Sequence, residues 1–155
     1  MRRLGEPAVA AAGLAAVAAL GDGSAAPLAA FAADEARART AAFAASLQGL
    51  GPRLAALPDV TVLPAELRGH LAGEAARCAA RGERITGLLA RLEELFASAG
   101  LRAVPLKGAA LVLRKEIPAG LRPMADLDLL FASEADLRAA AARIGAALGY
   151  APLWN

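Results

Sequence analysis

The sequence predicts an α+β fold, in which a helical region over residues 1–100 precedes a partial α/β core over residues 101–155 with a short mixed sheet and helices. The composition is 57% hydrophobic but 4% aromatic, so alanine and leucine supply most of the apolar content and favour helix. Gly and Pro residues divide the first 100 residues into segments of helical pattern. After Gly100 the pattern changes to strand, helix, loop, strand and helix.

Within the helical region, breaks are expected at residues 21–23, 49–52 and 57–64, where Gly and Pro gather. The clearest helix is expected from Pro64 to about Ser98. Apolar or small residues recur there at spacings of three and four, at Leu67, Leu71, Ala75, Cys78, Gly82, Ile85, Leu89, Leu92 and Phe96. The charged residues between them alternate in sign, which is typical of a solvated helix face.

The amino-terminal residues leave two interpretations open. Met1 to Arg3 and the apolar run Ala8 to Leu20 have the order of a signal peptide, whereas Pro7 suits the first turn of an ordinary alanine-rich helix. The run of 13 residues is too short to span a bilayer, which takes about 20. We favour the helix, with no membrane association.

Charge and cysteine content exclude some classes of function. The net charge of +2 arises from 17 basic and 15 acidic residues mixed along the chain, and no basic cluster contains interleaved aromatic residues. The sequence therefore carries no strong nucleic-acid signal. The single cysteine, Cys78, cannot form an internal disulfide, which favours a reducing, cytoplasmic location.

The α/β core is expected to begin with an extended segment at residues 101–105 and a short helix at residues 108–114. A strand is predicted over residues 126–132 from its alternating pattern. Ser133 has an acidic residue three positions later, as in a capping box, and predicts a helix over residues 134–148 that Gly149 ends.

Two carboxylates stand at the start of the predicted strand. Because side chains alternate along a strand, Asp126 and Asp128 are expected on one face, with Cα atoms roughly 6.5–7 Å apart. Short carboxylates at this separation can close around a hard divalent cation. An isolated Asp-x-Asp is more often a solvated strand edge.

A second feature lies upstream of the pair. In Leu106-Lys107-Gly108-Ala109, a glycine is expected where an extended segment meets a helix. Backbone N–H groups of Gly108 and Ala109 at a helix start can receive phosphate oxygens, and Lys107 can add a positive charge. The two features together indicate a site for a metal ion and a phosphate.

These residues resemble the nucleotidyltransferase superfamily, whose motif is a glycine turn that opens a helix, followed by a strand with Asp-x-Asp or Asp-x-Glu. More narrowly, Leu106-Lys107-Gly108 and the stretch Leu121-Arg122-Pro123-Met124-Ala125-Asp126-Leu127-Asp128-Leu129-Leu130 resemble a bacterial family of largely uncharacterised nucleotidyltransferases. Departures from the superfamily are Ala109, where a second glycine or a hydroxyl residue is usual, and a longer gap between turn and strand. The resemblance covers residues 90–150.

The resemblance implies transfer of a nucleoside monophosphate from a nucleoside triphosphate to a hydroxyl of an unidentified acceptor, a small molecule or a protein. Asp126 and Asp128 would be the catalytic residues and the ligands of one or two Mg²⁺ ions. Lys107, Gly108 and Ala109 would bind phosphate. Arg122 would either contact phosphate or hold its loop by bonding backbone carbonyls.

A third carboxylate on a later strand is also implied, and no residue before Asn155 fits that role. Glu134 and Asp136 are expected to be helix caps. The site is therefore expected to be incomplete in a C-terminally truncated chain, and the alternative function is a catalytically inactive remnant or a binding module of nucleotidyltransferase fold.

Overall fold

The structure is a computed structural model that describes residues 5–150. Contacts between Cα atoms group the chain into two compact units, Met1–Ala80 with Gly120–Pro123 and Arg81–Ala119 with Met124–Asn155. Helices together with a small antiparallel sheet confirm the α+β fold class and its helical amino-terminal region. The boundary at residue 100 between separate folding domains stays a prediction.

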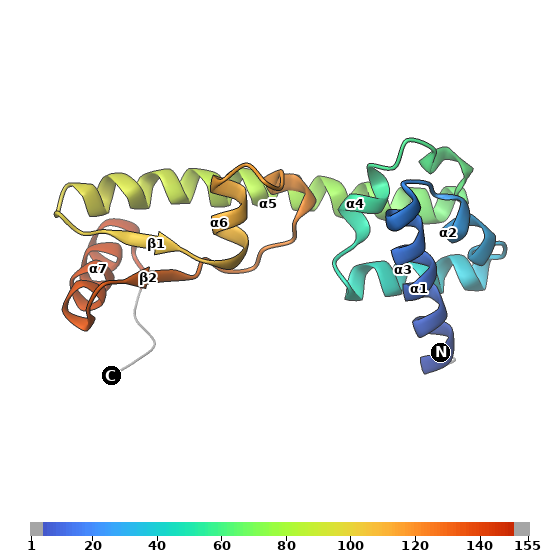
Figure 1. The fold of residues 1–155 in the computed structure, drawn as a ribbon, viewed down its shortest axis with the longest axis horizontal. Coiled ribbons are helices and arrows are strands. Elements are labelled where there is room, and N and C mark those ends of the chain that lie inside the picture. Colours follow the sequence, from blue (N-terminus) through green and yellow to red (C-terminus); the bar gives the residue numbers. More distant parts are fainter. Residues whose placement is uncertain (1–4, 151–155) are drawn as a thin grey trace. The chain divides into compact units, whose positions relative to one another are not determined.

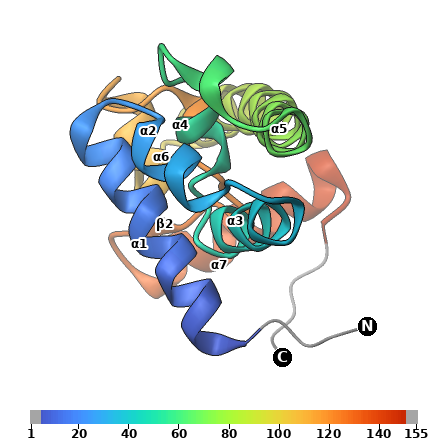
Figure 2. The same ribbon diagram turned by 90° about the vertical axis from the view of Figure 1, so that its right-hand side faces the viewer.

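The first unit is built of short helices and the first half of a long one (Figures 1 and 2). Its elements are α1 (Glu6–Asp22), α2 (Ala26–Phe31), α3 (Glu35–Leu47), α4 (Gly51–Ala55), the 3₁₀ turn η1 (Val60–Val62) and the beginning of α5 (Ala65–Ala97). Three of the connections fall at or next to the predicted breaks at residues 21–23, 49–52 and 57–64, whereas the connection between α2 and α3 at residues 32–34 contains no Gly or Pro and was not predicted. None of the described helices combines the length and apolar character needed to cross a membrane.

Alanine dominates the core of the first unit. Four leucine side chains are fully buried there, namely Leu28, Leu54, Leu67 and Leu71, and alanines of α1 and α3 surround them. Since alanine extends only one methyl group from the backbone, α1 and α3 can pack closely against each other. Ala12, Ala16 and Ala19 of α1 are buried, so the run Ala8 to Leu20 forms part of a packed helix.

Helix α5 confirms the prediction of one long helix with one apolar stripe, and its ends agree with the predicted ends within one residue. Leu67 and Leu71 of the stripe belong to the core of the first unit. The later members, Ile85, Leu89, Leu92 and Phe96, belong to two clusters of the second unit.

The second unit contains the sheet. Strand β1 (Ala103–Pro105) pairs antiparallel with β2 (Leu129–Phe131), so that Val104 lies opposite Leu130. The other elements are α6 (Lys107–Leu113) and α7 (Glu134–Leu148), while the turn η2 (Ala119–Leu121) crosses from one unit to the other. Figure 1 shows β1 and β2 side by side, with α7 close to them.

One face of the sheet packs on helices. Ala103, Leu129 and Phe131 join a cluster with side chains of α5 and α7. Within it the rings of Phe96 and Phe131 meet edge to face, with centroids 5.5 Å apart and planes at 82°, an arrangement that aromatic quadrupoles favour. The opposite face exposes Val104 and Leu130.

The sheet differs from the prediction in two respects. Its strands in the described part of the chain are antiparallel, where a mixed sheet was predicted, and the strand predicted over residues 126–132 is restricted to Leu129–Phe131. The physical reason is the short partner strand. Because the chain leaves β1 at Pro105 and enters α6 at Lys107, residues before Asp128 face no strand with which to pair.

Candidate functional site

The sheet register brings the two predicted features together. Pro105 lies opposite Leu129, and the next residues continue the ladder because the Leu106 amide donates a hydrogen bond to the Asp128 carbonyl, 2.9 Å away. Lys107 and Gly108 follow directly. The start of α6 is therefore held beside Asp128 by backbone pairing, although the two are about 20 residues apart in sequence.

Asp128 and Lys107 form an ion pair. Lys107 Nζ lies 3.1 Å from Asp128 Oδ2, with side chains that are 72% and 34% exposed. An ion pair this open to water contributes at most about 1 kcal/mol. The sequence predicts a phosphate contact for Lys107. In the structure the Lys107 ammonium group balances one of the two carboxylates.

The backbone of Lys107 is in the left-handed region, with φ of 48°. This conformation is uncommon for a residue with a side chain and costs of order 1–3 kcal/mol. It falls at the single residue that turns the chain from extended Leu106 into the helix. A strained residue that also carries the ion pair marks this turn as a site of interest.

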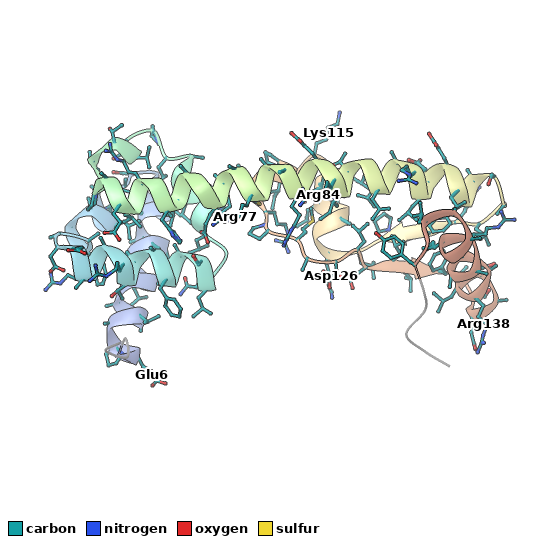
Figure 3. The ribbon with its side chains drawn as sticks, turned by 180° about the vertical axis from the view of Figure 1, so that it is seen from behind. Glu6, Arg77, Arg84, Lys115, Asp126 and Arg138 are labelled. Carbon is teal, nitrogen blue, oxygen red and sulfur yellow. The ribbon has the colours of Figure 1, made fainter. Side chains whose placement is uncertain are left out.

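Asp126 is exposed and lies outside the strand. Its carboxylate makes no hydrogen bond or ion pair with residues 5–150. Figure 3 shows its side chain directed away from the part of α5 around Arg84. The strand alternation that predicted a shared face for Asp126 and Asp128 therefore does not apply to Asp126.

Apolar anchors hold the backbone on both sides of Asp126. Met124 is buried in a cluster with Ile85 and Leu89 of α5 and Ala109 of α6, and Leu127 is half-buried against the same cluster. Between these anchors Asp126 projects to solvent. The packing of Met124 and Leu127 thus fixes the backbone on both sides of Asp126 but leaves the Asp126 carboxylate open to water.

Gly108 and Ala109 form the first turn of α6, and both are buried. The amides of a first helical turn have no partner within the helix. Leu106 is the extended cap residue, and no side chain caps this end. The helix predicted at residues 108–114 is confirmed with a shift of one residue.

Arg122 belongs to the first unit, with Gly120 to Pro123. In that unit Gly120 packs against Ala79 of α5, and Pro123 packs against Gly49. The Nε atom of Arg122 is buried and has no hydrogen-bond partner. No hydrogen bond from Arg122 to a backbone carbonyl is present in the described part of the chain, so the structure offers no support for a loop-holding role.

The other acidic residues near the sheet, Glu134 and Asp136, lie in the first turn of α7, but neither side chain caps the helix, so the prediction that they are caps is wrong. The cap is Ser133, whose Oγ accepts a hydrogen bond from the Asp136 amide at 3.1 Å, while Glu134 pairs with Arg138. Among residues 5–150, no three His, Cys, Asp or Glu side chains come together in a way that could hold a metal ion. A third carboxylate beside Asp126 and Asp128 is thus not found in this part of the chain.

The second unit contains a cleft of about 750 Å³ between β1 and the end of α5. Its lining is mainly apolar and includes Leu92, Phe96 and Val104, with Glu93 and Arg102 as charged members. Neither aspartate nor Lys107 lines it. Of the candidate metal and phosphate residues, Lys107 and Asp126 are exposed on the protein surface, whereas Gly108 and Ala109 are buried.

The glycine turn at Gly108 and the segment with Asp126 and Asp128 are the features on which the resemblance to the nucleotidyltransferases rests. A family model described as an uncharacterised nucleotidyltransferase matches residues 33–153, which is more than three quarters of the chain. The chain belongs to this family. No curated protein and no solved structure matches it.

Proposed function

We propose that this protein is a Mg²⁺-dependent nucleotidyltransferase that joins a nucleoside monophosphate from a nucleoside triphosphate to a hydroxyl group of its acceptor. Family membership supports the class of reaction and a nucleotide substrate. The observation that carries the assignment of residues is the ladder bond between Leu106 and Asp128, because it sets the glycine turn beside an acidic side chain.

The donor set suits Mg²⁺. This ion prefers oxygen ligands and is commonly held by one or two carboxylates together with substrate phosphates and water. Asp126 and Asp128 would supply the two carboxylates. An ammonium group already lies beside Asp128, which is consistent with a position that favours positive charge. When bound, Mg²⁺ would stabilise negative charge on the attacking and leaving oxygens of the transfer.

Lys107 would pair first with Asp128 and, once a metal ion is bound, with a phosphate of the nucleotide. In the structure its ammonium group pairs with Asp128. If a metal ion takes over Asp128, the Lys107 side chain, which is largely exposed, is released to contact a phosphate oxygen. A lysine is suited to this exchange because it is a flexible point charge with rotatable donors.

The amides of Gly108 and Ala109 would receive phosphate oxygens at the start of α6. Arg122 is a further candidate for phosphate binding on the strength of its motif alone. The acceptor would be a small molecule or a protein that presents a hydroxyl group.

The test is calorimetric titration of the chain with ATP and with GTP, with and without Mg²⁺, followed by an assay for pyrophosphate release. Asp126→Asn combined with Asp128→Asn should abolish the Mg²⁺-dependent part of binding. The matched control is Glu116→Gln combined with Glu134→Gln, which removes two exposed carboxylates of the same unit and should leave binding unchanged.

Lys107→Ala should lower nucleotide affinity several-fold while it changes the free energy of unfolding by less than about 1 kcal/mol. Equal nucleotide affinity in the wild type and the double aspartate variant would overturn the metal site. Mg²⁺-dependent binding without pyrophosphate release, with a range of hydroxyl acceptors supplied, would favour a binding module over an enzyme.

A further inference from the structure

Three polar side chains of the first unit meet between α3 and α5. Ser46 Oγ lies 2.8 Å from His70 Nε2 and 2.5 Å from Glu74 Oε1. The His70 nitrogen and the Glu74 oxygen are 3.7 Å apart. Ser46 is exposed and the His70 side chain is 37% exposed, so an ion can reach the cluster from solvent.

We propose that Ser46, His70 and Glu74 form a binding site for a divalent transition-metal ion of the Zn²⁺ type. His70 and Glu74 are four residues apart on α5, so the helix presents both on one face. An imidazole nitrogen and a carboxylate oxygen are two of the three common protein ligands of zinc. The Ser46 hydroxyl adds a neutral third donor from the neighbouring helix.

The separation of His70 Nε2 and Glu74 Oε1, 3.7 Å, suits two ligands of one ion. Tetrahedral zinc with bonds of roughly 2.0–2.2 Å holds its ligand atoms about 3.4 Å apart. Ser46 Oγ lies closer to both atoms, at 2.8 and 2.5 Å, so its side chain would rotate outward to become the third ligand. The remaining coordination position would face outward to water.

Gly51, the first residue of α4, leaves room for the Glu74 carboxylate. A Cβ atom at this position would overlap that carboxylate. The backbone of Gly51 is not in the left-handed region, so conformational freedom does not account for the glycine. Its absent side chain leaves the space that the Glu74 carboxylate occupies beside Ser46 and His70.

The competing explanation is a hydrogen-bonded brace between α3 and α5. In a metal-free protein the Ser46 hydroxyl can donate to Glu74 while His70 Nε2–H donates to Ser46 Oγ. Zinc binding requires that the His70 proton occupy Nδ1 instead, and that the hydroxyl hydrogen turn away from Glu74. The two explanations therefore differ in whether the histidine ring responds to added metal.

The test uses the full chain without a histidine tag. Zn²⁺ is titrated by calorimetry, and the ring nitrogens of His70, the single histidine of the sequence, are followed by NMR. We expect one Zn²⁺ per chain and a large change at His70 Nε2. His70→Ala and Glu74→Gln should each weaken binding by about tenfold or more, and Gly51→Ala should weaken it because the new methyl group displaces Glu74.

The matched control is Glu66→Gln, because Glu66 is also four residues from His70 on α5 but precedes it, whereas Glu74 follows it. It should bind Zn²⁺ as the wild type does. An unchanged His70 ring in the wild type on addition of Zn²⁺ would leave a hydrogen-bonded brace only and overturn the proposal. Loss of binding in Glu66→Gln but not in Glu74→Gln would also overturn it.

Discussion

Met124→Ala tests whether packing holds the segment that carries Asp126. The Met124 side chain is 6% exposed and lies in a cluster with Ile85, Leu89 and Ala109. Burial of a methionine side chain is worth about 1.5–3 kcal/mol, and the cavity left behind brings measured losses to about 2–5 kcal/mol. Because this cluster has few buried members and lies beside an exposed loop, neighbouring side chains can partly fill the cavity that Met124→Ala leaves, which places the loss at the low end of this range. We expect a loss of about 2–3 kcal/mol.

The loss is measured by urea denaturation, with circular dichroism as the probe. Hydrogen exchange adds a local measurement, because amides of α6 should exchange faster when Ala109 loses its contact with Met124. The control is Leu113→Ala, also a large apolar side chain of the second unit but 49% exposed, which should cost less than about 1 kcal/mol.

Nucleotide affinity should fall in Met124→Ala although both aspartates remain, since the backbone on one side of Asp126 loses its anchor. A urea midpoint equal to that of the wild type would refute the packing argument. Normal nucleotide affinity in a variant that has lost the expected stability would show that the anchor does not position Asp126.

Three further predictions concern stability. The Ser24 hydroxyl and the Ala25 amide donate to Asp59 and lower the pKa of its carboxyl below the ordinary value of 3.8. The stability that this carboxylate provides is present above pH 3.8 and is lost as pH falls through the lower folded value, so unfolding curves of the wild type and Asp59→Asn should converge in acid. Gly69→Ala should raise the free energy of unfolding by about 0.5–1 kcal/mol, because Gly69 lies within α5 and a Cβ would meet open space. Gly120→Ala should lower it instead, since its Cβ would lie 3.3 Å from the backbone of α5; urea midpoints decide both glycine predictions.

The elements that could be predicted from the sequence are those whose pattern repeats many times. The apolar stripe of α5 recurs over 33 residues, so both ends agree with the structure within one residue. The cap at Ser133 is also local, because it depends on residues three positions apart. Such features need no knowledge of distant partners.

The strand ends and the side-chain partners could not be predicted, because they depend on pairing. The alternation at Asp126 has the pattern of a strand, yet a strand needs a neighbour, and β1 is only three residues long. The ion pair between Lys107 and Asp128 depends on the sheet register, which the sequence does not reveal. His70 is half-exposed, and its partner Ser46 comes from another helix, so the sequence does not reveal that the two side chains meet.

The proline in β1 has a consequence for how this sheet can grow. Because Leu106 bonds to Asp128, the antiparallel alternation turns the backbone nitrogen of Pro105 away from β2. Proline has no N–H group, so an incoming strand would find no donor at that position of the β1 edge. The outer edge of β2 carries a donor at both Leu129 and Phe131. A strand added to the sheet, from this chain or from another molecule, is therefore expected to pair with the outer edge of β2, the strand that directly follows Asp126 and Asp128.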